Sequence, residues 1–251
     1  MVSRKQFQML FGCAVIFTGV LSACGVSIQS VPDGSSSSSS SGGSAVTTAE
    51  GLWTGKITNP QERKVTEIIL DDGTFYFFYS SSSDLEKIAG VMQGGSSSEK
   101  SLFSSSDAKE FPLEGLGVTP RSLSSSYANY PSQFGTVVGT SYKFSLTASS
   151  SYSQEAKLSD VVGSFSGEAG SISSVVYATN FSINQAGILS GTSQQCQFSG
   201  TVSPHKSVNV FDAVITFKGG TCVLGANSLK GIAYYDSSSK RLLMSVLNTA
   251  R

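Results

Sequence analysis

The feature that most constrains the fold is the alternation of apolar and polar residues in the second half of the chain. Phe211, Ala213, Ile215 and Phe217 all fall on one side of residues 209–217. Successive side chains of a strand point to opposite faces, so this spacing is typical of antiparallel strands with one buried face. Serine makes up about a fifth of the chain and glycine 26 residues, and both are unfavourable in helix interiors. The sequence therefore predicts a mostly β protein, an antiparallel barrel or sandwich.

Two hairpins are predicted from turn residues between apolar runs. Asp71-Asp72-Gly73 separates Val65–Leu70 from Thr74–Tyr79, and Asp-Gly is a strong hairpin signal. A closing hairpin joins Ser228–Asp236 to Arg241–Leu247. Both hairpins support an antiparallel arrangement.

Other segments carry weaker patterns. One or two helical turns are expected near Ser153–Asp160, with Ser153 as the N-cap. The serine-dense stretches at 94–106 and 122–126 are expected to be loops or weak edge strands. Helix is therefore expected to be scarce.

A short motif occurs twice. Gly51-Leu52-Trp53-Thr54-Gly55 and Gly163-Ser164-Phe165-Ser166-Gly167 both place an aromatic residue between glycines, about 110 residues apart. Two related β lobes fit this repeat, with boundaries at 50–152 and 153–251. A chance recurrence in a chain rich in serine and glycine is the alternative.

The first 24 residues predict export. Arg4 and Lys5 precede the apolar run Met9–Leu21, which is too short to cross a bilayer as a helix and has the form of a signal peptide, residues 1–23. The run ends in Leu21-Ser22-Ala23-Cys24, which resembles the lipobox of bacterial lipoproteins. That resemblance implies cleavage before Cys24 and acylation, including palmitate, of Cys24. A plain secretory peptide with Cys24 as a free thiol is the alternative.

The residues after Cys24 predict a tether. Residues 24–49 include seven consecutive serines, Ser35–Ser41, and have almost nothing to bury, so a flexible coil is expected. Gly25 stands where an Asp would favour retention at the inner membrane, so the lipoprotein resemblance implies the outer membrane. Whether the protein faces the periplasm or the outside is not specified by these residues.

The four cysteines have different expected fates. Cys13 leaves with the signal peptide, and Cys24 is the lipidation site. Cys196 and Cys222 remain as one pair in an exported chain, where disulfides persist, so a disulfide is expected. A metal or redox pair is the alternative, but the pair lacks C-x-x-C spacing and a neighbouring histidine.

Catalytic patterns are lacking in the sequence. The single histidine, His205, is expected in a surface turn, and no Gly-x-Ser-x-Gly elbow accompanies it. Asp71 and Asp72 fit a turn better than an acid/base or calcium pair. The ligand types for a zinc site are too few, and with 17 basic and 17 acidic residues there is no basic block for nucleic acid. We predict no enzyme activity, no cofactor and no metal.

Two further resemblances concern the fold. Gly51-Leu52-Trp53 resembles the G-x-W that opens the first strand of lipocalins, which implies a calycin-like barrel with Arg241 stacked on Trp53. The chain is also similar to serine- and glycine-rich proteobacterial lipoproteins in three segments, a likeness that implies a β fold and export but no activity. The segments are Asp72–Tyr76, Ile88–Gly94 and Gly231–Tyr235.

Three functions are compatible with these features. The leading one is a lipid-anchored, non-catalytic β module of the cell envelope that binds a protein partner or a small apolar ligand; an empty apolar barrel would favour it. A surface adhesin or interaction protein is the alternative, favoured by a filled core and exposed aromatic residues. An envelope hydrolase would need His205 and two carboxylates in one pocket. The candidate aromatic residues are Tyr127, Tyr130, Tyr234 and Tyr235.

Overall fold

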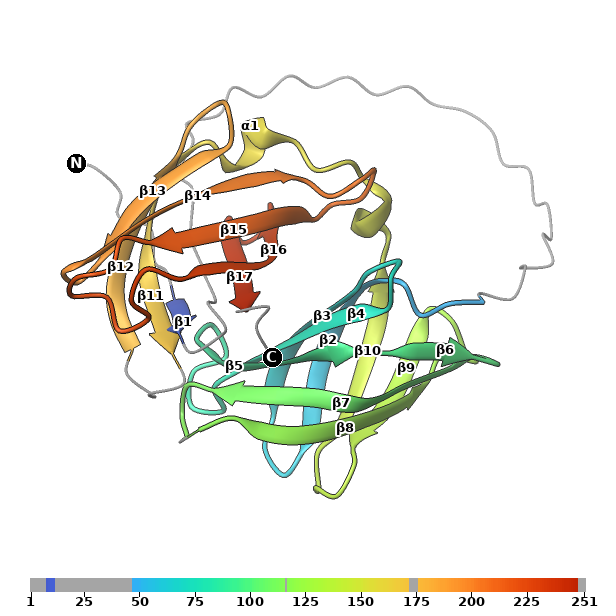
Figure 1. Cartoon of the computed structure of the whole chain (residues 1–251). Helices are drawn as coiled ribbons and strands as arrows, with labels where there is room; N and C mark the ends of the chain where they lie inside the picture. The colour runs from blue at the N-terminus through green and yellow to red at the C-terminus, as the bar shows by residue number, and fades with distance from the viewer. Residues whose placement is uncertain (1–7, 12–46, 116, 172–175, 248–251) are drawn as a thin grey trace, which may run out of the picture.

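The chain folds almost entirely into β-strands, as the alternation predicts. The computed structural model describes residues 8–11, 47–115, 117–171 and 176–247 (Figure 1). The expected cleavage site, Cys24 and most of the tether lie outside these residues. The end of the tether is described, and there the expectation of a flexible coil was wrong: Ala49 is 0 % exposed, and its N–H donates to Ser98 Oγ at 3.0 Å. Two curled sheets lie against each other. In the part of the chain so described, no helix is long and apolar enough to span a membrane.

The first sheet is a closed barrel. Each strand pairs antiparallel with the next along the chain, except that β5 pairs with β7, and β10 returns to pair with β2. Eight strands thereby close the ring, and short β6 lies beside β7. The strands are β2 (Gly51–Asn59), β3 (Arg63–Ile69), β4 (Thr74–Ser80), β5 (Ile88–Gly95), β6 (Ser97–Glu99), β7 (Leu102–Pro112), β8 (Thr119–Ser126), β9 (Ser132–Val137) and β10 (Lys143–Ser149).

The barrel interior is filled by its own side chains. Phe75 and Phe103 meet edge to face, with ring centroids 5.4 Å apart, and Phe77 packs on Phe144 at 5.1 Å. Trp53 belongs to the same buried cluster. The empty apolar interior that would favour the leading function is therefore not found, because the described side chains fill the barrel.

The second sheet is a meander of seven strands that curls but does not close on itself. Its described strands are β11 (Gly163–Ser171), β12 (Val176–Ile183), β13 (Ile188–Ser193), β14 (Cys196–Pro204), β15 (Phe211–Phe217), β16 (Ser228–Asp236) and β17 (Arg241–Leu247). An eighth strand, β1 (Gln8–Phe11), pairs parallel with β11 and also lies beside β17 (Figure 1). β1 belongs to the segment in which the sequence predicts a signal peptide.

The two sheets pack through their outer faces. Alternate residues of β4 serve both cores: Phe75 and Phe77 point into the barrel, whereas Tyr76 and Phe78 join the cluster between the sheets. This double burial explains the continuous apolar run of β4. From the second sheet the cluster takes residues of β16 and β17, chiefly Ile232, Tyr234 and Leu243. Within it, Ser245 Oγ donates a hydrogen bond to Gln93 Oε1, 2.9 Å away.

Between the sheets the helical expectation is only partly met. Helix is scarce, but it consists of the 3₁₀ turn η1 (Ser150–Ser153) and the short α1 (Leu158–Val161). The Ser153 cap was wrong: Ser149 caps η1, and Lys157 precedes α1 without a side-chain cap. Any of several neighbouring serines could serve as the N-cap. Ser149 does so because β10 ends there.

Of the two alternatives for the serine-dense stretches, the loops were wrong and strands are found, although only short β6 (Ser97–Glu99) stands at a free end of the strand order. They form parts of β5 to β8, all inside the barrel sheet. Phe103 and Leu123 point inward from these strands and are buried, and the intervening serines Ser104 and Ser124 face outward and are exposed. Tertiary burial of a few apolar anchors therefore overrides the weak strand preference of serine.

The repeated glycine–aromatic motifs occupy the same place in the two sheets. Gly51 opens β2 with φ +154°, and Gly163 opens β11 with φ +132°. Trp53 and Phe165 follow two residues later, and both are buried in the core of their own sheet. The two lobes thus begin alike.

Candidate functional site

A cavity of about 210 Å³ lies at one mouth of the closed barrel. It lies where β2 and β4 end and where β3 and β5 begin. Its apolar lining consists of Ile57, Ala89, Met92 and Pro112, and its polar lining of Arg63, Tyr79, Glu110, Glu114 and Tyr142. An apolar floor with a few fixed polar groups is the usual composition of a small-molecule site, although this cavity is smaller than the roughly 300–1,000 Å³ of drug-sized sites.

Glu110 is the centre of the polar side of the mouth. Tyr79 donates its hydroxyl hydrogen to Glu110 Oε1 at 2.6 Å, and Arg121 Nε donates to Oε2 at 2.6 Å. Burial, and then the Glu110 charge, raise the pKa of Tyr79 well above its usual value. Tyr79 therefore remains a neutral donor, and its ring and hydroxyl are held in place.

Arg63 also lines the mouth. Its guanidinium donates to Ser80 O at 2.9 Å and to Glu114 Oε2 at 3.0 Å, and it lies over the Tyr79 ring, 5.6 Å from the centroid. Arg63 in the lining and Arg121 behind Glu110 are thus both paired with carboxylates. Because the charges compensate one another, the arrangement suits a small, mainly uncharged ligand rather than an ion.

Sequence analysis missed the buried carboxyl of Glu67. Its side chain is 0 % exposed inside the barrel, and neither carboxyl oxygen has a well-formed hydrogen bond. Burial raises its pKa to about 8, and Gln133 nearby offsets the shift only in part. Gln133 Oε1 also lacks a hydrogen-bond partner, while its Nε2 donates to Ser125 Oγ at 2.7 Å. The signal was available, because alternation puts Glu67 on the same face as Val65 and Ile69.

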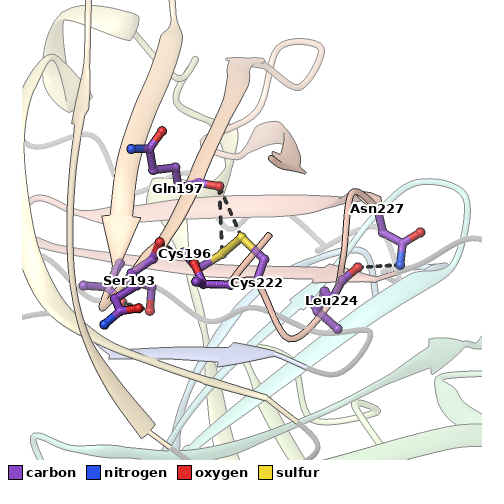
Figure 2. Close-up of a disulfide and its surroundings, with 9 residues drawn as sticks. Ser193, Cys196, Gln197, Cys222, Leu224 and Asn227 are labelled. Carbon is purple, nitrogen blue, oxygen red and sulfur yellow. Dashed lines mark hydrogen bonds between the residues drawn. A yellow bond between two sulfur atoms is a disulfide. The ribbon is translucent and has the colours of Figure 1, made fainter. Parts of the chain in front are cut away.

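The expected disulfide is confirmed. Cys196 at the start of β14 is bonded to Cys222 in the loop between β15 and β16, and Figure 2 shows both beside Gln197. In the same loop Asn227 Nδ2 donates to Leu224 O at 2.6 Å. A second cavity of about 240 Å³ adjoins the disulfide. Its lining is Tyr177, Ser193, Gln194, Gln195, Cys196, Phe217, Thr221, Val223 and Leu224.

His205 lies in a turn, as expected, but its side chain is only 15 % exposed. Its Nδ1 is 2.7 Å from Asp212 Oδ1, and its Nε2 faces Asp71 Oδ1 at 3.6 Å. Asp71 also pairs with Lys206, whose hydrogen bond is the main cause that lowers the pKa of Asp71. The cluster joins the β3–β4 turn to the β14–β15 turn and so links the two sheets.

This cluster lacks the geometry of a hydrolase. Two carboxylates do meet His205, yet among the described residues no hydroxyl group hydrogen bonds to it, and Nε2 has no hydrogen-bond partner. A triad needs a nucleophile at that nitrogen. The other aspartate of the pair, Asp72, acts as the turn predicts, since its Oδ1 accepts from Thr74 N at 2.8 Å.

The predicted stacking of Arg241 on Trp53 is not found, so this prediction was wrong. Trp53 Nε1 donates to Ala49 O at 2.8 Å, and its ring contacts Tyr127 and Tyr130, with centroids 6.4 and 6.0 Å away. Arg241 lies in the other sheet and pairs with Glu86. A three-residue motif carries no information about which distant strand faces it.

Most of the candidate aromatic residues are buried. Tyr130 is 54 % exposed, whereas Tyr127, Tyr234 and Tyr235 belong to the cores. Across the described ranges, no group of three or more metal-ligating side chains is found. No family model, curated protein or solved structure matches the chain.

Proposed function

We propose that the chain is an exported lipoprotein, acylated at Cys24 and anchored in the outer membrane, which acts as a non-catalytic β binding module. Its barrel mouth takes a small, mainly uncharged ligand. The leader and Leu21-Ser22-Ala23-Cys24 support the anchor. The observation that carries the binding role is the mouth cavity, with its apolar floor and its compensated charges.

The anchor is tested by replacing the acylated residue. We expect the intact mass of the natural protein to lack the leader and to include acyl chains, and that of the Cys24→Ala variant to retain the leader without acyl chains. A natural protein without acyl mass would refute lipid anchoring. Protease treatment of intact cells, with a periplasmic marker as control, then reports which face of the outer membrane the protein occupies.

The mouth is tested with an apolar dye, Nile red, in a fluorescence titration. Ala89→Leu adds volume to the cavity floor and is expected to weaken dye binding at least tenfold. Val138→Leu, an exposed position on the β9–β10 hairpin, is the matched control. Comparable melting temperatures would exclude unfolding as the cause. Equal dye affinity in both variants would show that the dye binds elsewhere and would overturn the proposed site.

A second candidate, a surface interaction protein, has one observation in its favour. Leu102 on β7, Ser126 on β8 and Phe134 on β9 are cross-strand neighbours in one row on the outer face of the barrel. Leu102 and Phe134 are 54 % and 53 % exposed. Exposed apolar residues in a row are typical of contact surfaces. Cleavage by external protease on intact cells would favour this candidate, and protection would exclude it.

A further inference from the structure

The second sheet lacks a strand that the barrel possesses. In the barrel, β10 lies between β9 and β2 and pairs with both, so the ring closes. The seven-strand meander of the second sheet leaves one edge on β11 and one on β17. Among the residues that the structure describes, β1 alone lies between these two edges (Figure 1).

β1 comes from the segment that the proposed processing removes. Its register on β11 is parallel, from Gln8 opposite Glu168 to Phe11 opposite Ser171. Cleavage before Cys24 would detach this strand from the rest of the protein. The backbone N–H and C=O groups of β11 that face β1 would then lack partners, which is the property that makes a sheet edge a template for another chain.

We propose that in the processed protein the slot between β11 and β17 is a strand-acceptor site. It takes an extended peptide segment of a partner protein, at least four residues long and apolar at alternate positions. This inference rests on the export and cleavage proposed above. The leader occupies the site in the precursor, so the site opens only when the leader is cut off.

The side chains at the slot define the occupant. Ala169 and Phe165 belong to the buried core, and Gly167 lies between them on the same face of β11. Small residues at 167 and 169 leave space for larger apolar side chains on an incoming strand. The barrel shows such a strand at the equivalent place, because β10 turns Phe144 and Leu146 inward and exposes Lys143 and Thr147.

Charge at the slot is already compensated. Glu168 on β11 forms an ion pair with Lys87 of the barrel sheet at 3.1 Å. An incoming strand therefore needs no charged residue to match this edge. Main-chain hydrogen bonds supply affinity and the alternating apolar side chains supply selectivity, as in other modes of strand addition.

The chain's own tether is a poorer match. Residues 26–31 read Val-Ser-Ile-Gln-Ser-Val, and the apolar spacing changes from two to three after Ile28. A shift of one residue turns the next apolar side chain to the opposite face. Residues 34–44 of the tether are serine and glycine alone, so they bring no apolar side chain to the core.

The test uses the processed protein, purified in detergent from membranes, with its intact mass measured. The probe is a fluorescein-labelled peptide of residues 5–12, and the control peptide carries Met9→Pro and Phe11→Pro. Proline removes backbone donors and cannot continue a ladder. We expect saturable binding by fluorescence polarisation, at least tenfold weaker for the control peptide and for the uncleaved Cys24→Ala precursor. Hydrogen exchange at residues 168–171 should slow when the peptide binds.

The outcomes separate the two proposals. A mass that retains the leader on the natural protein would overturn both the processing and the open slot. A processed mass with no saturable binding, or with equal binding of the proline peptide, would overturn the slot alone. Slow exchange, before peptide is added, of those β11 N–H groups that face β1 and do not bond to β12 would also overturn it. Light scattering would then show what covers the β11 edge. A dimer would indicate a second copy of the chain, and a monomer would indicate the tether.

Discussion

The closed barrel and the open sheet are built from the same kind of strand, yet only one of them closes. Both are antiparallel meanders that begin with a positive-φ glycine and a buried aromatic residue. The barrel closes because β5 reaches β7 and β10 reaches β2. The comparison teaches that closure depends on the presence of one more strand and on its register, and not on the composition of the strands.

The two cores differ at one matched position. Opposite Trp53 in the barrel stands Glu67, whereas opposite Phe165 in the second sheet stands Phe181, stacked on it at 5.1 Å. The barrel thus buries a carboxyl where the open sheet buries a ring. Substitutions at these positions test whether the two lobes are stabilised alike.

The largest effect is expected from Glu67→Gln. The pKa of Glu67 in the folded state is about 8, against 4.5 in the unfolded chain, so the folded state holds the proton more tightly. Burial of Glu67 therefore costs stability progressively as the pH rises from 4.5 to 8, up to about 5 kcal/mol, and the cost is constant above pH 8. The glutamine variant should gain stability at pH 9 and little at pH 4.

Urea unfolding across this pH range measures the effect. Glu110→Gln is the control, because Glu110 is paired with Arg121 and Tyr79, and its neutralisation is expected to destabilise. Parallel pH profiles for Glu67→Gln and the natural protein would show that Glu67 is charged in the folded state.

Next in size are Trp53→Ala and Phe165→Ala. Loss of a buried ring costs about 3–5 kcal/mol, and the cost is smaller where the surroundings can collapse. Trp53 stands in a closed ring, whereas Phe165 lies on the strand beside the slot. We expect Trp53→Ala to be the more destabilising of the two in urea titrations of the processed protein. A larger loss of stability for Phe165→Ala than for Trp53→Ala would show that the slot beside β11 is rigid and filled.

Removal of the disulfide should affect the open sheet alone. The bond closes 26 residues between Cys196 and Cys222, so the double replacement by serine is expected to cost about 3.5 kcal/mol in the chain-entropy account. Hydrogen exchange should accelerate in β14 to β16 and remain unchanged in β2 to β10. Equal acceleration in both sheets would show that they unfold as one unit.

The smallest effect concerns the contact between the sheets. Ser245→Ala removes the hydrogen bond to Gln93, whose Nε2 already lacks a partner, and should cost about 1–2 kcal/mol. Ser228→Ala, which removes an exposed hydrogen bond with Thr216, is the control and should cost less than about 0.5 kcal/mol. Thermal unfolding of the three proteins provides the comparison. Equal melting temperatures for both variants would show that apolar packing, and not this hydrogen bond, stabilises the contact between the sheets.

Local patterns predicted part of the fold and of the candidate site. The Asp71-Asp72-Gly73 hairpin and the β16–β17 hairpin depend on neighbours in sequence, and both are confirmed. The mouth cavity was not predicted, because Arg63 and Glu114 are 51 residues apart and no repeat or motif connects them. His205 was assigned to a turn correctly, but its contact with Asp71 spans the two sheets.

The sequence by itself determined the β class, the hairpins, the likeness of the two lobe starts and the cysteine pair. Alternation, turn residues and compartment act over short distances and can be read from the chain. Tertiary structure alone decided that the serine-rich strands join the barrel, that Arg241 meets Glu86 instead of Trp53, and that β1 lies between β11 and β17. These outcomes depend on pairing between strands far apart in the chain, where register and burial are collective properties that no local pattern specifies.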